Sequence, residues 1–358
     1  MIRQKMLAVR PVGCLAALAL TACSTAQAQT VGVGQMPVAI AANTVTHKIY
    51  VLSEKDSTVT VIDGITHATA TIKTGAGPQG IAVNTVTNKI YTANAPDSTV
   101  TVIDGATNAV TATVRTGSFC QSLVVNPATN KIYVANNFGH SVTVIDGATN
   151  TTTTVQVGQG PRGIALNPVT NKIYTVNYGS KNVTVIDGAT NSATNVTTGK
   201  HPWAVAVDSR SNKTYVANED DANVTIIDGA TGKTKNVAVG EMPFAVAVNP
   251  TTHKAYVLSY ASDTLTVIDG TTGLVTKTVH LASHPQTIAV NPQTNKVYIA
   301  NQKTANVSVL DGTTNAITAT MKTGSIPYAI AVDSAANEIY VANYNSDSVT
   351  VIHGQAIH

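Results

Sequence analysis

Short apolar runs rich in valine and isoleucine alternate with polar stretches rich in asparagine, aspartate, glycine and threonine over most of this chain. Residues 131–147 show the unit most clearly: two runs of alternating β-branched residues are joined by a short polar loop that contains a glycine. This pattern predicts a β-hairpin. Because no stretch has a sustained helical period, we predict an all-β fold.

The hairpin recurs eight times along the chain. Each copy opens with Lys-Ile-Tyr or a close variant, which ends at Tyr50, Tyr91, Tyr133, Tyr174, Tyr215, Tyr256, Tyr298 and Tyr340. Consecutive tyrosines are 41 or 42 residues apart, a period typical of propeller blades. In each unit a Gly-x-x-Pro turn precedes an apolar strand a, an Asn-Pro-x-Thr-Asn turn leads to strand b, a variable loop to strand c, and an Asp-Gly-Ala-Thr-Asn turn to a threonine-rich strand d.

The number of strands predicts how the ring closes. The chain holds eight sets of strands a, b and c but only seven complete strands d after them. Residues 30–34 (TVGVG) align with residues 154–158 (TVQVG), so we expect the N-terminal segment to complete the last blade and leave no open edge. The prediction is an eight-bladed β-propeller of four-stranded blades. It forms a single domain over residues 30–354, and residues 355–358 are a tail.

Four copies of the tyrosine motif carry a family resemblance. Residues 133–136, 215–218 and 340–343 read Tyr-Val-Ala-Asn, and residues 174–177 read Tyr-Thr-Val-Asn. Here the chain resembles the YVTN β-propeller repeat family, although Val-Leu-Ser follows Tyr50 and Tyr256 instead. The resemblance covers about residues 30–354 and implies a secreted, periplasmic or surface-layer propeller for binding or adhesion, with no shared catalytic motif. Many members have seven blades, so the predicted eighth is a departure.

The first 22 residues predict export. Arg3, Lys5 and Arg10 precede an apolar stretch that is too short to cross a bilayer but typical of a signal peptide. Leu-Thr-Ala-Cys matches the bacterial lipobox, in which Cys23 is lipidated and residues 23–29 form a tether; the alternative is cleavage after Ala28 by ordinary signal peptidase. We favour a lipoprotein, periplasmic or anchored to the outer membrane through Cys23, over a freely secreted protein.

Charge and cysteine content limit the functions that we expect. Three of the 22 basic residues lie in the leader, which leaves 19 basic and 19 acidic residues in the mature chain. A neutral chain gives no support for nucleic-acid binding. Cys120 has no partner once the leader is removed, so we expect no disulfide. We predict a monomer.

The repeats differ mainly in the loop before strand a and the loop between strands b and c. These loops share one face of the propeller, which we call the variable face; the a–b and c–d turns share the opposite, invariant face. Of the chain's 12 Tyr, 3 Phe and 1 Trp, eight are the repeat tyrosines, which we expect to pack between blades with their hydroxyls outward. The others belong to the variable face: Phe119, Phe138, Tyr178, Trp203, Phe244, Tyr260, Tyr328 and Tyr344. Large aromatics on a rigid scaffold are typical of a binding surface; the alternative is that they cap the apolar strand ends.

The residue after the entry proline is expected to approach the mouth of the central channel. Around the ring this position holds Val38, Gln79, Gln121, Arg162, Trp203, Phe244, Gln286 and Tyr328. Amides and one guanidinium among aromatic rings suit a protein, peptide or glycan ligand, with Arg162 as the anion contact; a structural ion pair of Arg162 is the alternative. The predicted binding residues are Phe119, Gln121, Phe138, Arg162, Tyr178, Trp203, Phe244, Tyr260, Gln286, Tyr328 and Tyr344.

Metal binding is a weaker hypothesis. His201, Met242 and His284 precede the proline or its equivalent in three consecutive blades, and imidazole with thioether would suit copper. Their separation of 41 to 42 residues is not a metal motif, so we expect a polar lining, no metal and no cofactor. The run Glu219–Asp221 is either a weak cation site or a solvated loop.

Two other functions compete with binding. A propeller hydrolase or lyase would use Arg162, His201, His284 and Tyr328 at the channel mouth, with or without a metal. A structural envelope or surface-layer component would associate through its threonine-rich edges. No catalytic triad order or nucleotide-binding motif is present, and we predict no catalytic residue. Cys120 at the start of an apolar strand is expected to pack rather than react.

Overall fold

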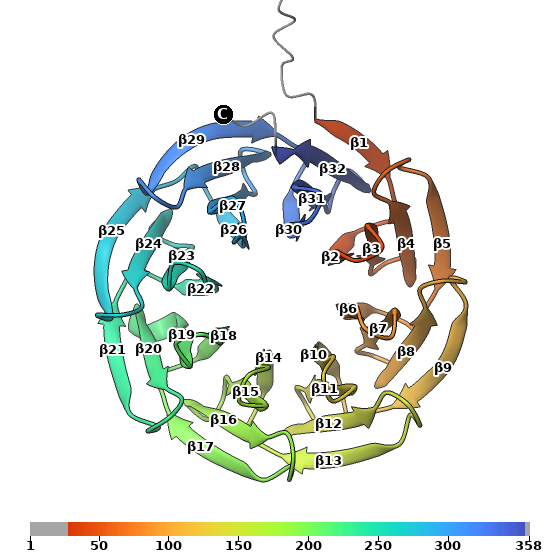
Figure 1. Cartoon of the computed structure of the whole chain (residues 1–358), viewed down its shortest axis with the longest axis horizontal. Helices are drawn as coiled ribbons and strands as arrows, with labels where there is room; N and C mark the ends of the chain where they lie inside the picture. Colours follow the sequence, from red (N-terminus) through yellow and green to blue (C-terminus); the bar gives the residue numbers. More distant parts are fainter. Residues whose placement is uncertain (1–27, 355–358) are drawn as a thin grey trace, which may run out of the picture.

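The computed structural model describes residues 28–354 as a closed ring of eight antiparallel sheets around a central channel (Figure 1). Each sheet has four strands, and in seven of the eight sheets the order from the axis outward follows the chain. The one helix among the described residues is a short 3-10 turn, η1 (Glu219–Asp221). None of the helical structure described is long and apolar enough to cross a membrane. The eight-bladed all-β propeller predicted from the repeats is therefore confirmed.

The strands of the first four blades, from the axis outward, have the following bounds. Blade 1 contains β2 (Pro37–Asn43), β3 (Lys48–Ser53), β4 (Thr58–Asp63) and β5 (Thr69–Lys73). Blade 2 contains β6 (Pro78–Asn84), β7 (Lys89–Asn94), β8 (Thr99–Asp104) and β9 (Val110–Arg115). Blade 3 contains β10 (Cys120–Asn126), β11 (Lys131–Asn136), β12 (Ser141–Asp146) and β13 (Thr152–Gln156). Blade 4 contains β14 (Pro161–Asn167), β15 (Lys172–Asn177), β16 (Asn182–Asp187) and β17 (Ala193–Thr197).

The second half of the ring repeats this arrangement. Blade 5 contains β18 (Pro202–Asp208), β19 (Lys213–Asn218), β20 (Asn223–Asp228) and β21 (Thr234–Ala238). Blade 6 contains β22 (Pro243–Asn249), β23 (Lys254–Ser259), β24 (Thr264–Asp269) and β25 (Leu274–His280). Blade 7 contains β26 (Pro285–Asn291), β27 (Lys296–Asn301), β28 (Asn306–Asp311) and β29 (Ala316–Lys322). Blade 8 contains β30 (Pro327–Asp333), β31 (Glu338–Asn343), β32 (Ser348–His353) and β1 (Gln29–Gly32).

The two middle strands of each blade form the core. In β11 and β12 nearly every residue is buried, which explains why these runs carry no charged residue between Lys131 at the start of β11 and Asp146 at the end of β12. The outer strand β13 exposes its threonines and buries only Val155. Threonine keeps the β-branched preference for strands while its hydroxyl faces water, so the outer edge stays extended and wet.

The repeat tyrosines pack between blades, as predicted. Tyr91 of blade 2 belongs to one core cluster with Val125, Ile132 and Ile145 of blade 3. The expectation that the hydroxyls point outward is wrong, because all eight tyrosines are at most 1% exposed. Burial, followed by the charge of Asp104, raises the pKa of Tyr50 to about 12. The inter-blade layer is deep enough to enclose the whole ring and its hydroxyl.

The N-terminal strand closes the ring, also as predicted. β1 pairs with β32 in antiparallel register, with Val31 opposite Val349, and Val31 packs in one cluster with Ile49 of blade 1. The strand starts at Gln29, one residue inside the predicted tether. Figure 1 shows the first and last strands, β1 and β32, side by side. The predicted signal peptide and Cys23 lie outside the described residues.

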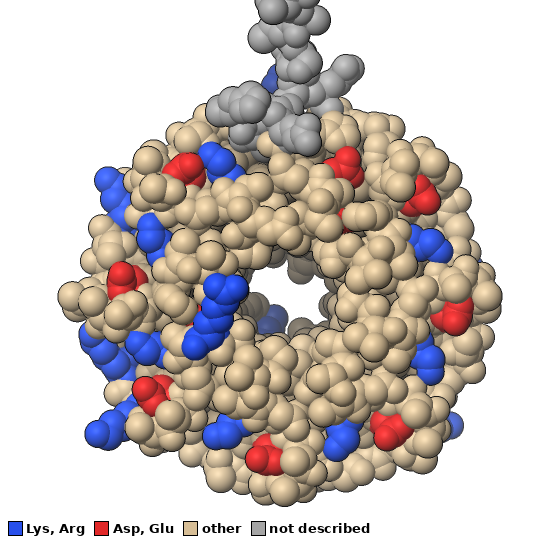
Figure 2. Space-filling model, in the orientation of Figure 1, with Lys and Arg blue, Asp and Glu red and all other residues tan. Residues whose placement is uncertain are grey.

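The invariant face carries a ring of contacts from each blade to the next. At six junctions the last residue of strand a is an asparagine that donates its Nδ2 to the Oδ1 of an asparagine in the following a–b turn, as Asn84 does to Asn130 at 2.9 Å. Basic and acidic side chains alternate around this face (Figure 2). Lysines such as Lys89 donate to a carbonyl of the next blade, Gly147 O at 2.9 Å. These regular contacts hold neighbouring blades at a fixed spacing.

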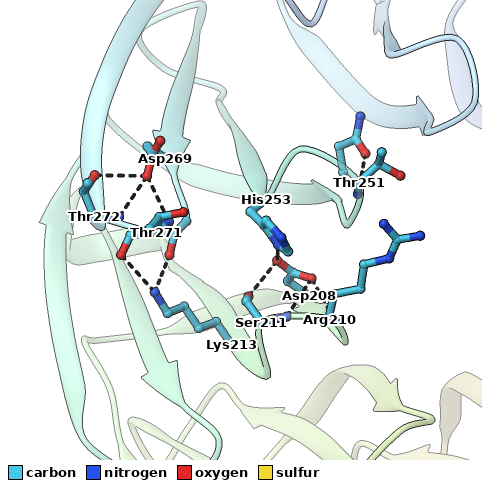
Figure 3. Close-up of polar contacts among 11 residues, drawn as sticks. Asp208, Arg210, Ser211, Lys213, Thr251, His253, Asp269, Thr271 and Thr272 are labelled. Carbon is cyan, nitrogen blue, oxygen red and sulfur yellow. Dashed lines mark hydrogen bonds and ion pairs between the residues drawn. The ribbon is translucent and has the colours of Figure 1, made fainter.

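Two junctions replace both asparagines at once. Asp208 Oδ2 lies 2.7 Å from His253 Nδ1 (Figure 3), and Asp333 Oδ2 lies 2.7 Å from His47 Nδ1. Both aspartates are 0% exposed. The sequence interpretation treated these turns as nearly constant and missed the exchange. The sequence does contain a sign of this exchange, because each aspartate at the end of a strand a is matched by a histidine in the a–b turn of the next blade.

Candidate functional site at the channel mouth

Hydrogen bonds confirm the predicted division into two faces. On the variable face the b–c loop lies beside the loop that enters strand a, since Ala95 N donates to Gly77 O at 3.3 Å and Tyr178 N to Gly160 O at 3.1 Å. On the invariant face the c–d turn lies beside the a–b turn, since Gly147 N donates to Asn130 O at 2.8 Å. The loops that differ between blades therefore surround one end of the channel, which we call the mouth.

A register shift at the start of each inner strand directs one side chain into the channel. In blade 5 the ladder passes from the Pro202 pair directly to the Ala204 pair, and Trp203 between them is unpaired. The same shift follows Pro243 and Pro327. Bulges of this kind re-aim a side chain away from the regular alternation. This is why the residue after the entry proline reaches the channel in blade after blade.

These side chains line an open cavity of about 380 Å³, the first cavity. Its lining includes seven of the eight positions that follow the proline or its equivalent: Val38, Gln79, Gln121, Arg162, Trp203, Phe244 and Tyr328. The sequence prediction that this position converges on the mouth is thus confirmed. The volume lies within the range of small-ligand pockets.

A second cavity of about 360 Å³ adjoins the first. The two share Arg162, Trp203, Phe244 and Tyr328, and the second adds Glu219, Met242, Tyr260 and Gln286. The shared residues come from blades 4, 5, 6 and 8. A ligand in the mouth would contact both cavities through these four side chains, one cationic and three aromatic.

The guanidinium of Arg162 lies over the ring of Trp203, with Cζ 3.3 Å from the ring centroid. Within residues 28–354 this guanidinium forms no ion pair and no hydrogen bond, so the structural ion pair considered as an alternative for Arg162 is wrong. Burial is the main influence on the Arg162 pKa and lowers it below its usual value, against the opposing charge of Glu219. Stacking of this type fixes a guanidinium plane and leaves its N–H edges free.

Tyr178 is held in place beside this pair. Its ring stacks on His201 with centroids 4.4 Å apart and planes 13° apart, and it meets the Trp203 ring edge-on at 5.8 Å. His201 Nδ1 in turn lies 2.5 Å from Asp220 Oδ2. Burial first, and then the charges of Glu219 and Asp220, raise the pKa of Tyr178 above its usual value. Tyr178 therefore supports the mouth from behind Trp203 and does not line either cavity.

The acidic run of η1 has three separate roles that the sequence interpretation did not resolve. Glu219 lines the second cavity, and its Oε2 is buried without a hydrogen-bond partner among the described residues. Asp220 binds His201, and Asp221 accepts the Lys200 backbone N–H at 2.8 Å. The role of Glu219 could have been inferred from its position in the sequence, because it is the first residue of the b–c loop. Tyr178 and Tyr260 occupy the same position in the neighbouring blades.

The remaining predicted aromatic residues form pairs. Phe244 meets Tyr260 edge-on at 5.7 Å, and Tyr328 packs against Tyr344 at 5.5 Å. Phe119 stacks on Phe138 at 4.5 Å, but neither lines the two cavities. Phe138 is 65% exposed. The structure thus brings together seven of the predicted binding residues, places Tyr178 and Tyr344 behind them, and puts Phe119 and Phe138 outside.

The three candidate metal ligands have different surroundings. His201 is paired with Asp220, His284 Nδ1 lies 2.7 Å from Ser283 Oγ beside a separate cavity of about 290 Å³, and Met242 lines the second cavity. Over residues 28–354 no group of three or more His, Cys, Asp or Glu is placed to hold a metal ion. Cys120 is buried in the core, and burial raises the pKa of its thiol. Its packing role is confirmed.

Comparisons with known proteins support the propeller. A family model described as a YNCE-like beta-propeller matches residues 201–358. No curated protein matches the chain. Hydrazine synthase from Kuenenia stuttgartiensis is similar in structure with a TM-score of 0.65 and 18% sequence identity, over 89% of this chain and 95% of that one. A dihydro-heme d1 dehydrogenase, NirN, in complex with DHE has a TM-score of 0.75 and 13% identity, over 88% and 72%. Identities this low show the fold alone.

Proposed function

We propose that this protein is a non-enzymatic binding propeller that takes a protein, peptide or glycan ligand at the mouth of its channel. The observation that carries the proposal is the convergence of seven bulged positions on one cavity, because the same backbone feature in seven blades delivers six different types of side chain. A rigid ring that varies only these side chains and the loops around them has the general form of a binding site on a scaffold.

Among these ligands the mouth favours a peptide. A sugar would stack on a broad ring face, and one face of the Trp203 ring is already covered by Arg162 at 3.3 Å. The cavities also present the amides of Gln79, Gln121 and Gln286 together with small apolar groups. An extended peptide matches these groups, because it presents alternating N–H and C=O groups between its side chains.

We further propose that this protein is a YVTN-type repeat protein that acts outside the cytoplasm. Use of the lipobox would tether it through Cys23. The direction of β1 supports an orientation in which the mouth faces away from the membrane. Gln29 pairs with Val351, and Gly32 pairs with Ser348 next to the b–c loop, so β1 runs from the invariant face toward the variable face. A tether before Gln29 would hold the invariant face against a membrane and leave the mouth pointing away from it.

Binding of peptide and glycan arrays by purified protein tests the proposal. Trp203→Ala and Phe244→Ala are each expected to weaken binding of the selected ligands by about tenfold to a hundredfold, because central buried aromatics carry most of the binding energy at such sites. Phe138→Ala is the matched control, since it removes an exposed phenylalanine from the same face outside both cavities. Equal binding by wild type and both mouth variants would overturn the proposal.

A further inference from the structure

Resting on the proposed binding function of the same mouth, we propose that its ligand is a peptide that presents a carboxylate to Arg162 inside the channel. Arg162 is the second residue of β14 and reaches the cavity through the register shift that follows Pro161. It lines both cavities, so it lies where the two cavities meet. No other lysine or arginine lines either cavity.

The guanidinium of Arg162 is oriented so that it can bind a planar partner. Trp203 supports one face of the group at 3.3 Å, which fixes the plane, and none of the described side chains takes its N–H groups. A guanidinium in a fixed plane presents its donors as a fork that matches the two oxygens of a carboxylate. A half-buried cation without a partner loses part of its hydration, and a bound carboxylate would supply the missing partner.

The charges around Arg162 set the direction from which an anion approaches. The first cavity is lined by amides and apolar groups and by no acid. Glu219 lines only the second cavity, and Glu54, which lines neither, accepts a hydrogen bond from Gln79 Nε2 at 2.8 Å. A carboxylate is therefore favoured on the first-cavity side of Arg162, and Glu219 would disfavour it on the other side. The remainder of the peptide would extend over Phe244 and Tyr260 in the second cavity.

The experiment measures the preference of the full chain for carboxylates. Three libraries of random hexapeptides serve as probes: one with a free C-terminal acid, one with the same sequences amidated, and one with a free acid but with Asp and Glu replaced by Asn and Gln. The wild type is expected to bind the library with both kinds of carboxylate about tenfold or more tightly than one of the two libraries that lack one kind. Comparison of the three libraries tells whether the group is the terminal or a side-chain carboxylate.

Variants identify the residue responsible. Arg162→Gln should abolish the carboxylate preference, whereas Arg162→Lys should keep part of it because the charge remains without the fork. Glu219→Gln should increase the affinity for the same peptides several-fold. Arg210→Gln is the matched control, since Arg210 lies in the a–b turn of blade 5 on the invariant face. Thermal unfolding of each variant verifies that the fold persists.

The outcomes separate this inference from the proposed function. If peptides bind and depend on Trp203 and Phe244, but all three libraries bind alike or Arg162→Gln keeps the preference, the carboxylate inference is overturned and the binding function stands. If no peptide binds and a glycan does, the peptide assignment is overturned. Binding that ignores every mouth variant would overturn both.

Discussion

The two Asp–His junctions show how a single residue position in this ring is constrained by a partner in the next blade. Asp208 Oδ1 accepts the backbone N–H of Arg210 at 3.0 Å, and Oδ2 accepts Ser211 Oγ at 2.6 Å beside His253 (Figure 3). Burial alone would raise the pKa of Asp208, but the hydrogen bonds from Ser211 and His253 lower it below its usual value. The carboxylate is therefore buried in its charged form only because its partners are in place.

We predict that His253→Asn destabilises the protein by about 1–3 kcal/mol, because a buried acceptor loses its partner. The double variant Asp208→Asn with His253→Asn should recover most of this loss, since it restores the asparagine pair found at six other junctions. Denaturant unfolding of the four proteins gives the coupling energy directly. A double variant no more stable than His253→Asn would show that the two residues are not coupled.

The stability difference between wild type and Asp208→Asn depends on pH, and the sign of this dependence is defined. Because the native pKa of Asp208 is lowered, its carboxylate stabilises the fold above the pKa of the unfolded chain, near 4, and that contribution is lost as pH falls through the native pKa. The advantage of wild type over Asp208→Asn should therefore be complete at neutral pH and shrink below about pH 4.

At the scale of the element, one short strand decides whether the ring is closed. β1 has four residues, yet it covers β32, whose Val349 and Val351 are 0% exposed. The other seven outer strands follow a c–d turn within their own blade, whereas β1 is about 320 residues from its partner in sequence. Loss of β1 would uncover an unpaired edge and apolar side chains together.

We expect removal of residues 1–34 to lower the midpoint of thermal unfolding by several degrees and to promote association, because the edge of β32 becomes available for pairing with another chain. The control is removal of residues 1–27, which keeps β1 intact. Size-exclusion chromatography and thermal unfolding measure both effects. Identical behaviour of the two truncations would mean that β1 is not needed for closure.

At the scale of the whole molecule, the eight junctions between neighbouring blades are structurally equivalent. The distance from Asn84 Nδ2 to Asn130 Oδ1 is 2.9 Å and that from Asp208 to His253 is 2.7 Å, and the turn residues Asn130 and His253 have φ of 52° and 55°. Two different chemical pairs thus occupy one backbone geometry. The variation is local to each junction, and the ring as a whole is unchanged by it.

This equivalence predicts that an Asp–His pair can be moved. Asn84→Asp together with Asn130→His should be within about 1 kcal/mol of wild type in the free energy of unfolding, while Asn84→Asp alone should be less stable than the pair. Chemical denaturation of the three proteins at neutral pH measures this. A double variant less stable than Asn84→Asp alone would show that the junction between blades 5 and 6 has a local environment that the junction between blades 2 and 3 lacks.

The sequence by itself determined the strands, the turns, the blade number, the ring closure and the two faces. Each depends on a pattern within one unit, such as Lys131–Asn136, or on a comparison of units, as for Val31 with Val155. The position after the entry proline was also readable as a channel position, because every unit repeats it.

Only the tertiary structure decided what these side chains do to each other. Arg162 and Trp203 are 41 residues apart in sequence but stack because consecutive blades place equivalent bulges side by side. Glu219 joins the cavity, and Phe138 stays outside it, for reasons of blade position that no local pattern contains. A repeat fixes where a side chain starts, but its partners come from neighbouring blades, and their contacts depend on side-chain size, direction and charge across the junction.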